Sequence, residues 1–500
     1  TDANGYALVD GTLREKDPTN GNDLYLTIDS GLQRNLDYLM SNAYSESGAE
    51  VVTAGVMEIK TGKILAMSTY PSFNPNERNI STFNNYFLEG TIECGSVFKP
   101  FIYADSIEEG KYDHNAYYNS GSYNVYYGNK LVATIKDHNG GQGWGTITYD
   151  QGLYHSSNVA ICNLLDQGYV TKDVLTEKLN DLGFFQGDTM DGLTCSSSIN
   201  AYTRKNAGRL EYLTTGFGQG STVTPYQLLK AYSVFGNDGK TVQPHIVDKV
   251  VNPKTNKVVY QATPKYSKQI FSTNTISQVK DLMLGVIEDE QGTGKTYRLD
   301  NDVRMIGKTG TGQVVENGGY STTLYMHSFV GIAPYDDPQV VMFLTFKSGD
   351  SYAQYMPNIV KQTMNEALQV VNRYNAKNTT AVDQSYTLDS YTNQSVNYVK
   401  SKLESKSLSV QIIGNGSSVI EQYPLAKSKV TSGDKVFIKT EGKDITLPNL
   451  IGWSKKEVQT YASLAGIQLT IDGTSGHVTA QSVGENTVVH SGDSLTVVIS

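Results

Sequence analysis

A serine and a lysine at the start of a predicted helix are the first candidates for chemistry. Ser96 and Lys99 are three residues apart, so both side chains lie on one face of the helix and the amine can reach the hydroxyl. A neutral lysine that accepts the serine proton turns that hydroxyl into a nucleophile. Cys94 and Gly95 indicate a turn, which places Ser96 at the positive end of the helix dipole. The pair is suited to covalent catalysis through Ser96, but the same spacing recurs elsewhere in the chain, so the pair alone does not identify a site.

A second motif, Ser156-Ser157-Asn158, supplies another hydroxyl and an amide. The Ser156 hydroxyl can relay a proton to a leaving amine, and the Asn158 amide can hold a substrate carbonyl. The same spacing of serine and asparagine occurs at three other serines, where turns or helix caps explain it more simply. This motif alone therefore does not identify a site.

A third motif, Lys308-Thr309-Gly310-Thr311, lies between two predicted strands. Lys308 and Thr309 could bind a carboxylate, and Gly310 would let a substrate backbone approach the strand edge. The Lys-Thr-Gly sequence at 60–62 repeats this third pattern but falls in a predicted hairpin turn. The Ser-x-x-Lys spacing of the first motif also occurs at two other places in the chain. The ordered set of three motifs is therefore the informative feature.

The elements that must bring these motifs together alternate between strand and helix patterns. A helix with an apolar stripe follows a short strand at 24–29, helical patterns dominate residues 100–230, and an amphipathic helix occupies 353–373. Further strands are predicted at 50–59, 63–70, 246–260, 303–306 and 326–346. Strands at both ends of the sequence with a helical block inserted between them predict an α+β fold.

The last quarter of the chain is an internal repeat. Residues 374–387 are poor in apolar side chains and indicate a linker. The tail can be aligned with itself so that Val399 lies opposite Val458. In this alignment Gln422 also matches Gln481, and Gly433-Asp434 matches Gly492-Asp493. Two small modules, each with strands and one helix, are therefore expected at the C-terminal end.

Composition excludes several classes of protein. The 500 residues carry 41 Lys and Arg against 50 Asp and Glu, a net charge of -9, and nucleic-acid binding needs a basic face. No apolar run approaches the roughly 18 residues that span a bilayer. Three cysteines exclude a disulfide-rich scaffold. A soluble globular protein with no nucleic-acid partner is expected.

The motifs and the sequence around them resemble the class B penicillin-binding proteins, which are monofunctional D,D-transpeptidases of cell-wall synthesis. The matching stretches are LTIDSGLQ (26–33), GVMEIKTGKILAM (55–67), HSSNVA (155–160), GFGQG (216–220) and IGKTGTGQ (306–313). The two repeats resemble PASTA modules, most clearly in LPNLIG (447–452). The resemblance implies the fold shared by penicillin-binding proteins and serine β-lactamases, an antiparallel sheet with a helical subdomain, followed by two β-α-β-β modules.

The domain boundaries follow from this resemblance. Residues 1–22 are expected to be the remnant of an N-terminal pedestal region, and 23–373 to be the transpeptidase domain. After the linker, 388–442 and 443–500 are expected to be the two PASTA modules.

The resemblance also implies roles for the motif residues. Ser96 would attack the carbonyl of D-Ala-D-Ala in a stem peptide, and an amine of a neighbouring stem would resolve the ester as a crosslink. Lys99 would be the base, which requires its pKa to fall from about 10.4 to about 7. Burial, with Lys308 as a nearby cation, would lower it. Ser156 would shuttle the proton.

The remaining motif residues would bind substrate. Asn158 would hold the peptide, and Lys308 with Thr309 would bind the terminal carboxylate. The backbone N–H groups of Ser96 and Thr311 would form the oxyanion hole, beside Gly310. This chemistry needs no cofactor.

The same resemblance implies partners and location. Besides stem peptides, the expected partners are β-lactams, as covalent inhibitors, and a membrane glycosyltransferase. The expected location is the extracytoplasmic face of the membrane in a Gram-positive-type cell. Because the chain begins at Thr1, it is interpreted as a fragment without its anchor.

Three departures from the family pattern surround the site. Cys94-Gly95-Ser96-Val97 replaces Pro-Gly-Ser-Thr, KTGTGQ (308–313) replaces KTGTAQ, and Asp137-His138 replaces Asp-Trp. None of these changes removes a catalytic atom.

The cysteines suggest a metal site. Cys94, Cys162 and Cys195, with His138 or His155, could bind a structural zinc ion. The alternatives are three separate buried thiols, or one disulfide and one spare thiol.

Two alternative functions stay open at this point. A serine β-lactamase or β-lactam sensor shares the motifs, but a lactamase needs a deacylating base, for which Asp188, Asp191 and Glu211 are the carboxylates in the broad region. A non-catalytic scaffold would bind muropeptides through 388–500, although the presence of both Ser96 and Lys99 argues against it.

Overall fold

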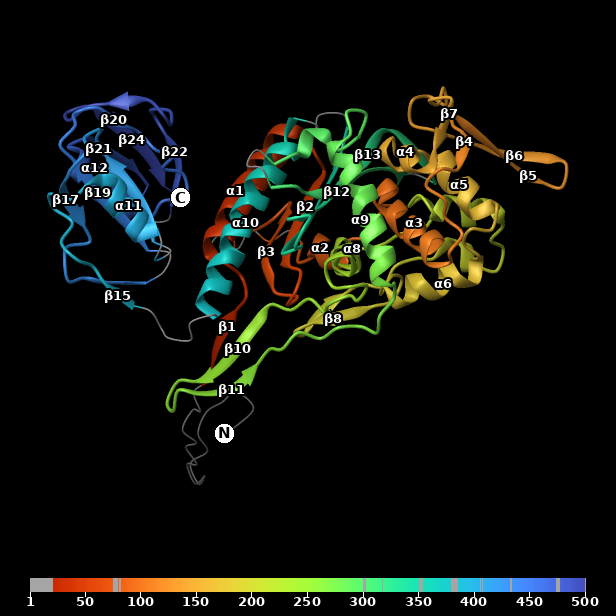
Figure 1. Ribbon diagram of the computed structural model, residues 1–500, viewed down its shortest axis with the longest axis horizontal. Helices are drawn as coiled ribbons and strands as arrows, with labels where there is room; N and C mark the ends of the chain where they lie inside the picture. Colours follow the sequence, from red (N-terminus) through yellow and green to blue (C-terminus); the bar gives the residue numbers. More distant parts are fainter. Residues whose placement is uncertain are drawn as a thin grey trace, which may run out of the picture.

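The structure is a computed structural model with a large N-terminal domain and two small C-terminal modules (Figure 1). It describes residues 21–74, 80, 82–299, 303–316, 318–349, 354–378, 385–404, 406, 408–431, 434–473 and 477–499. The predicted N-terminal remnant at 1–22 lies almost wholly outside the described residues, and so does the middle of the predicted linker, 379–384.

A five-stranded antiparallel sheet forms the centre of the large domain. Its strand order is β12-β13-β14-β2-β3. The strands are β2 (Val51–Glu58), β3 (Ile64–Tyr70), β12 (Ile306–Glu316), β13 (Gly319–Ala333) and β14 (Val340–Ser348). Strands from both ends of the domain thus pair in one sheet, and the predicted α+β arrangement is confirmed. The strand predicted at 303–306 begins later and is longer than expected: β12 starts at Ile306 and continues through the whole Lys-Thr-Gly-Thr motif.

Two long helices cover one face of this sheet. They are α1 (Ser30–Ser47) and α10 (Met356–Asn378), which lie side by side (Figure 1). The Asp29 carboxylate caps α1 by accepting from the N–H groups of Gly31 and Leu32, and Gly48 ends the helix in the left-handed conformation. The apolar stripe of α1, including Leu32 and Leu36, is fully buried against the sheet. These helices cover one face of the sheet, and β12 is one of its two edge strands.

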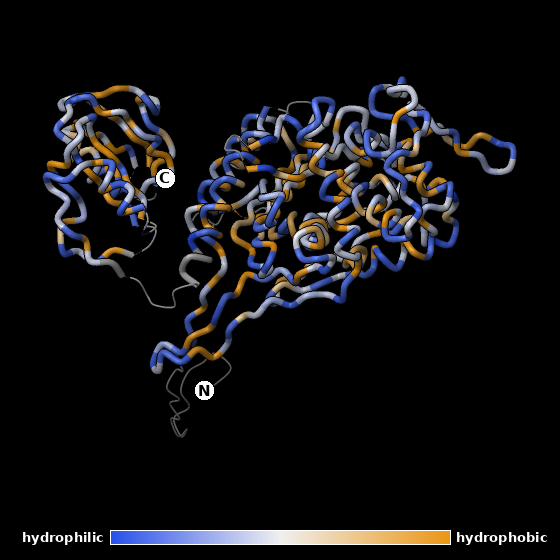
Figure 2. The backbone as a smooth tube through the Cα atoms, in the orientation of Figure 1, coloured by the Kyte–Doolittle hydropathy of each residue, from blue (hydrophilic) through white to orange (hydrophobic). Residues whose placement is uncertain are grey.

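The helical block lies between β3 and β12 in the sequence and packs on the other face. Its main helices are α2 (Tyr86–Glu89), α3 (Lys99–Glu108), α4 (Tyr149–Tyr154), α5 (Asn158–Asp166), α6 (Lys172–Asp181), α7 (Arg209–Thr215), α8 (Pro225–Tyr232) and α9 (Thr273–Glu288). One continuous core joins this block to the sheet. Figure 2 shows hydrophobic segments gathered inside the large domain.

Three small β pairs interrupt this block, which the helical prediction for 100–230 missed. They are β4 (Tyr117–Asn119) with β7 (Thr146–Thr148), β5 (Ser122–Tyr127) with β6 (Lys130–Lys136), and β8 (Asp188–Met190) with β9 (Leu193–Cys195). The β5–β6 hairpin reaches out from the domain (Figure 2). A further three-stranded sheet is built from β1 (Asp23–Leu26), β10 (Val247–Asn252) and β11 (Lys257–Gln261), and it also projects from the body (Figure 1).

The two C-terminal modules repeat one architecture. The first contains β15 (Ser385–Thr387), α11 (Val396–Glu404), β16 (Ser409–Ile413), β17 (Val419–Tyr423), β18 (Lys429–Thr431) and β19 (Lys435–Thr440). The second contains β20 (Ile445–Thr446), α12 (Lys455–Ala465), β21 (Gln468–Asp472), β22 (Val478–Gln481), β23 (Val488–Val489) and β24 (Ser494–Ile499). The three-stranded sheets have equivalent orders, β16-β19-β17 and β21-β24-β22.

Matched side chains confirm the internal repeat. Gln422 accepts a hydrogen bond from the N–H of Tyr391 at 2.7 Å, and Gln481, its predicted counterpart, accepts from the N–H of Leu450 at the same distance. In both modules the amide ties the helix-side loop to the sheet. Each module has its own hydrophobic core.

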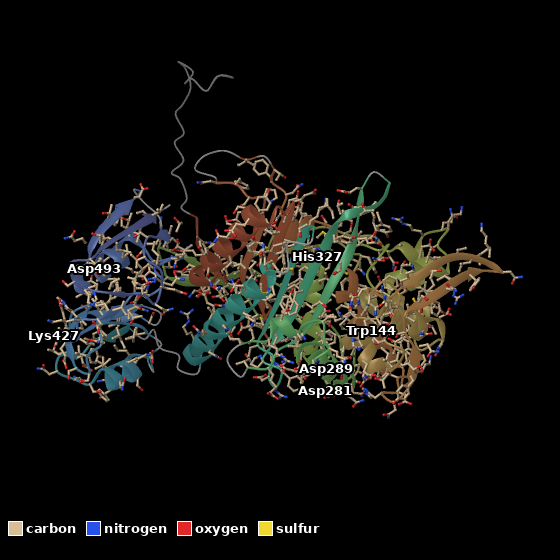
Figure 3. The ribbon with its side chains drawn as sticks, turned by 90° about the horizontal axis from the view of Figure 1, so that it is seen from above. Trp144, Asp281, Asp289, His327, Lys427 and Asp493 are labelled. Carbon is tan, nitrogen blue, oxygen red and sulfur yellow. The ribbon has the colours of Figure 1, made fainter. Side chains whose placement is uncertain are left out.

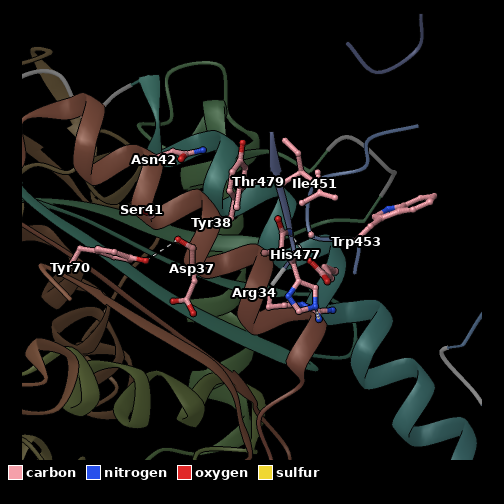
Figure 4. A pocket seen from close by; sticks show the side chains of 15 residues that line it. Arg34, Asp37, Tyr38, Ser41, Asn42, Tyr70, Ile451, Trp453, His477 and Thr479 are labelled. Atoms are coloured by element: carbon pink, nitrogen blue, oxygen red, sulfur yellow. Dashed lines mark hydrogen bonds between the residues drawn. The ribbon is translucent and has the colours of Figure 1, made fainter. Parts of the chain in front are cut away.

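The second module lies against α1 across a cavity of about 710 Å³ (Figure 4). Arg34 donates to Nε2 of His477 at 2.6 Å across this contact. Because arginine has no acceptor, Nε2 must be the unprotonated ring nitrogen. Partial burial, followed by the Arg34 charge, lowers the pKa of His477, while Glu457 opposes the shift.

This contact is expected to weaken in acid. The folded-state pKa of the His477 ring is lower than its ordinary value near 6.5. Above pH 6.5 the ring is therefore neutral and the contact with Arg34 is fully formed. Protonation at lower pH replaces the hydrogen bond by repulsion from Arg34. The distance between labels on α1 and α12, measured by fluorescence energy transfer, should increase between about pH 8 and about pH 5. His477→Gln should abolish that response, and an equal response in the variant would contradict the assignment.

Within the described part of the chain, every helix is too short or too polar to cross a bilayer.

Candidate active site

Ser96 lies in a tight turn that leads directly into α3. The turn is a 3₁₀ segment, Gly95–Phe98, and Lys99 is the first residue of the helix, followed by Pro100. Gly95 adopts φ +63° and donates to the carbonyl of Gly218 at 3.0 Å. This arrangement leaves Ser96 partly exposed while Lys99 is fully buried. The prediction of a turn followed by a helix is confirmed.

The turn packs against β12, the edge strand of the sheet. A Cβ added to Gly310 would lie 2.8 Å from the carbonyl oxygen of Cys94 and 3.0 Å from a methyl carbon of Val97. Gly310 was expected to make room for a substrate backbone, but its missing side chain admits the turn that carries the serine. Gly312 has the same role, because a Cβ there would lie 1.9 Å from the carbonyl oxygen of Glu93. The departure from KTGTAQ therefore fits a closer approach of this segment.

The second motif joins two helices at a strained corner. Ser156 adopts φ +58°, a left-handed conformation that is uncommon for serine, between α4 and α5. Ser157 caps α5 through its hydroxyl, which accepts from the N–H of Ala160 at 3.0 Å. The corner turns the Ser156 side chain toward the sheet edge.

Both motif lysines converge on Ser156. The Lys308 amine donates to Oγ of Ser156 at 2.8 Å and to the carbonyl oxygen of Thr309 at 2.9 Å. The Lys99 amine donates to the carbonyl oxygen of Ser156 and lies 3.4 Å from its Oγ. Among the described residues the Ser96 hydroxyl accepts no hydrogen bond from either amine. Ser156 is thus the group that connects the two lysines.

The three motifs line one cavity of about 400 Å³, here called the cleft. Its lining includes Ser96, His138, Ser156, Asn158, Phe217, Gln219, Thr293, Thr309, Gly310 and Thr311. Lys99 and Lys308 lie beneath it and are fully buried. The structure therefore gathers three distant stretches of sequence around Ser96.

Burial alters the protonation of both amines. It lowers the pKa of Lys99 to about 7, with the charge of Asp137 acting in the opposite direction. Burial and the neighbouring Lys99 cation lower the pKa of Lys308. Lys99 therefore becomes neutral near pH 7, as its predicted role as a base requires.

Two contacts hold the substrate-facing side chains. Asn158 donates through its amide to the carbonyl oxygen of Lys136 at 2.9 Å. The Thr309 hydroxyl lies 2.8 Å from the hydroxyl of Thr293, which precedes β12 in a loop after α9. Thr293 was not predicted from the sequence, because no motif links that loop to the other segments.

Aromatic rings border the cleft on its helical side. Trp144 stacks on His155 with ring centres 4.4 Å apart and lies 5.4 Å from the ring of His138. Figure 3 shows Trp144 in the helical part and His327 on the sheet side. Partial burial and the charges of Lys99 and Lys308 lower the pKa of His138, and burial lowers that of His155. Both rings are therefore neutral at pH 7.

The four residues predicted to bind zinc are not brought together. Cys94 precedes the serine turn, Cys162 lies within α5 and Cys195 lies on β9. His138 lies at the rim of the cleft. Within the described ranges, no three Cys, His, Asp or Glu side chains gather so that they could hold a metal ion. Each thiol is free and buried, and the three lie on different elements around one continuous core.

These thiols are expected to be unreactive in the native protein. Burial raises the pKa of all three, and the thiolate is the reactive form. Ellman's reagent should label none of the three cysteines at pH 8 in buffer and all of them in denaturant. Fast labelling of the native chain would contradict the described packing.

The carboxylates considered as deacylating bases make hydrogen bonds outside the cleft. Asp188 accepts from Tyr226 at 2.8 Å and from Lys230 at 2.7 Å. Asp191 accepts from two backbone N–H groups that begin β10, and Glu211 caps α7. Among the described residues that line the cleft, none is an aspartate or a glutamate. The geometry therefore does not favour a lactamase.

Comparison with known families gives matches to two domain families, at three places in the chain. Residues 52–369 match the penicillin binding protein transpeptidase domain, and residues 386–442 and 445–500 each match the PASTA domain. The first match covers more than half of the chain, and the other two coincide with the internal repeat.

Similar proteins cover most of the sequence. Stage V sporulation protein D of Bacillus subtilis is 29% identical over 464 residues, which make up 89% of this chain and 69% of that protein. A peptidoglycan D,D-transpeptidase FtsI homolog of Mesostigma viride is 27% identical, over 68% of this chain and 60% of that protein. A probable peptidoglycan D,D-transpeptidase PenA of Neisseria flavescens is 26% identical, over 72% of this chain and 85% of that protein.

Solved structures share the fold. Penicillin binding protein 2X from Streptococcus thermophilus matches with a TM-score of 0.66 and 24% identity, over all of this chain and 75% of that chain. The transpeptidase domain of penicillin-binding protein 3 from Burkholderia pseudomallei matches with a TM-score of 0.58 and 23% identity, over 69% of this chain and 96% of that chain.

Proposed function

The chain belongs to the penicillin binding protein transpeptidase family, and we propose that it crosslinks peptidoglycan as a D,D-transpeptidase with Ser96 as its nucleophile. The observation that supports this most strongly is the cleft itself. One partly exposed hydroxyl lies in a cavity where a second hydroxyl connects two buried amines.

The first half of the reaction forms an ester. Oγ of Ser96 attacks the carbonyl carbon of the penultimate D-Ala, and neutral Lys99 takes the hydroxyl proton. Backbone N–H groups of Ser96 and Thr311 stabilise the oxyanion. The C–N bond then breaks, and the proton passes through Ser156 to the amine of the leaving D-Ala. Ser156 suits this relay because Lys99 lies 3.4 Å from its Oγ.

The second half transfers the peptide to an acceptor. A neutral amine of a neighbouring stem attacks the ester carbonyl, its proton passes to Lys99, and the C–O bond to Ser96 breaks as the amide forms. Ser96 recovers its proton from Lys99. Every proton is thus returned, and the chemistry uses only side chains and backbone of this chain.

Lys308 and Thr309 would recognise the terminal carboxylate of the donor. Thr309 is held by Thr293, and Lys308 is anchored on the carbonyl oxygen of Thr309 at 2.9 Å. A bound carboxylate would offset the burial that lowers the pKa of Lys308 and would favour its charged form. Asn158, held by Lys136, would orient the peptide backbone.

Incubation with a fluorescent penicillin tests this function. A long-lived adduct that is absent from Ser96→Ala indicates a transpeptidase, because such an enzyme forms the ester and lacks a base for rapid hydrolysis. Rapid turnover of the penicillin would indicate a lactamase. Absence of label on a folded wild-type chain would favour a scaffold that acts through the PASTA modules.

Partners and location follow from the family. The proposed substrates are stem peptides with a D-Ala-D-Ala end and an amine acceptor, and β-lactams are the proposed covalent inhibitors. We also propose a membrane glycosyltransferase as partner and the extracytoplasmic face of the membrane in a Gram-positive-type cell as location. The two PASTA modules support the last proposal.

A further inference from the structure

A buried carboxylate lies directly behind the second motif. Asp137 follows β6 and is 1% exposed, and the three motifs do not include it. It is held in a turn, because its N–H donates to the carbonyl oxygen of Gly121 at 2.9 Å and its carbonyl oxygen accepts from the N–H of Gly141 at 3.0 Å. The N–H of Gly121 returns a hydrogen bond to Oδ2 of Asp137 at 2.8 Å. One oxygen of the carboxylate is thus fixed by the β5–β6 side of the block.

The other oxygen holds the start of α5. Oδ1 of Asp137 accepts from the hydroxyl of Ser157 at 2.8 Å, from the N–H of Asn158 at 2.7 Å and from the N–H of Val159 at 3.1 Å. A carboxylate at a helix N-terminus satisfies N–H groups that the helix itself cannot, and the helix dipole attracts its negative charge. The residue immediately before these donors is Ser156, in its left-handed conformation. Asp137 therefore clamps the corner that presents Ser156.

We infer that Asp137 is a positioning residue for acylation: it holds the Ser156 corner between the two lysines and places a negative charge near Lys99. The inference rests on the proposed function of the cleft. It explains how a strained serine keeps its hydroxyl 2.8 Å from Lys308 and its carbonyl on Lys99.

Asp137 is the negatively charged group among the titratable side chains that face Lys99. The groups that face Lys99 are Asp137, the thiol of Cys162 on α5, Lys308 on β12 and His138 at the rim. Burial raises the pKa of Cys162, which keeps that thiol neutral. Asp137 is therefore the carboxylate that opposes the effect of burial on Lys99. If its charge is removed, the pKa of Lys99 falls further and the base is available at lower pH.

The test is the pH dependence of acylation by a chromogenic cephalosporin in Asp137→Asn. Two effects are expected together. The plateau rate constant falls about 100-fold, because the Ser156 corner is no longer held. The acidic limb of the profile, where the rate falls because Lys99 is protonated, moves to lower pH. The reason is that the pKa of Lys99 falls when the negative charge of Asp137 is removed. Asp150→Asn is the matched control: this carboxylate lies in the first turn of α4 and pairs with His114 outside the cleft, so both quantities should stay as in wild type.

A second variant separates position from charge. Ser157→Ala removes one donor to Asp137, together with the cap on the N–H of Ala160, and keeps the carboxylate, so the rate should fall about 10-fold while the limb stays in place. An unmoved limb in folded Asp137→Asn, or a plateau rate equal to wild type, overturns the inference. If Asp137→Asn does not fold, a wild-type rate in Ser157→Ala overturns it. A wild-type chain that is never acylated would instead refute the proposed function.

Discussion

Lys99→Arg is expected to slow acylation of Ser96 by at least about 1000-fold. Arginine is also a long basic side chain, one heavy atom longer than lysine, but it does not lose its proton in this pH range and so stays positively charged. Burial lowers the pKa of Lys99 to about 7, so the wild-type residue can be a neutral base where arginine cannot. The measurement is the second-order rate constant for acylation by a chromogenic cephalosporin.

The pH profile of the wild type provides a second reading of the same prediction. Below about pH 7 the rate should fall tenfold for each pH unit, because Lys99 is protonated, and above it the rate should level off. Lys230→Arg is the matched control, since this lysine is partly buried and paired with Asp188 outside the cleft. A Lys99→Arg variant that is acylated within tenfold of wild type would show that the amine acts only as a cation.

Gly95→Ala is expected to lower the acylation rate by about 100-fold, because it displaces the serine turn from the strand that completes the site. Gly95 adopts φ +63°, and an added Cβ would lie 2.5 Å from the carbonyl oxygen of Thr311. That contact separates Ser96 from the edge of β12, where the second donor of the oxyanion hole is proposed to lie. The rate is measured as above, together with the melting temperature.

Gly110→Ala is a close control for the cost of placing alanine in a left-handed backbone conformation. Gly110 adopts φ +67°, but nothing lies within 4 Å of an added Cβ. Both variants therefore incur the left-handed penalty of about 1–2 kcal/mol, and only Gly95→Ala adds the collision. Equal acylation rates in the two variants would contradict a close approach of the turn to β12.

The sequence was sufficient to predict which three segments meet in the cleft, because each motif is local. Ser96 and Lys99 share one helical start, and the remaining motif residues lie in two other short segments. The α+β class was also predictable, since strand patterns occur at both ends of the domain and helical patterns between them. The repeat was visible because both modules use the same residues, such as Gln422 and Gln481, for the same hydrogen bond.

Other features depend on contacts between distant residues that no local pattern records. Asp137 accepts a hydrogen bond from Ser157, which lies 20 residues further along the chain. The hydroxyl of Thr293, in a loop outside the motifs, is hydrogen-bonded to that of Thr309. The expected direct contact between Lys99 and Ser96 is replaced by bonds from Lys99 to Ser156. The zinc prediction relied on the positions of the cysteines close to the motifs in the sequence, and such positions do not reveal whether the folded chain brings the three thiols together.

The β pairs of the helical block were missed for a related reason. β5 and β6 are mostly exposed, so the hairpin lacks the strict alternation of apolar and polar residues that marks a half-buried strand. This hairpin matters for the site because the end of β6 delivers Asp137 to the base of α5.

A crystal structure of the chain acylated by a penicillin tests the account most directly. We expect an ester between Oγ of Ser96 and the opened lactam, its carbonyl oxygen between the N–H groups of Ser96 and Thr311, and the drug carboxylate on Lys308 and Thr309. An adduct on another residue, or a carbonyl that points away from β12 toward solvent, would contradict the account.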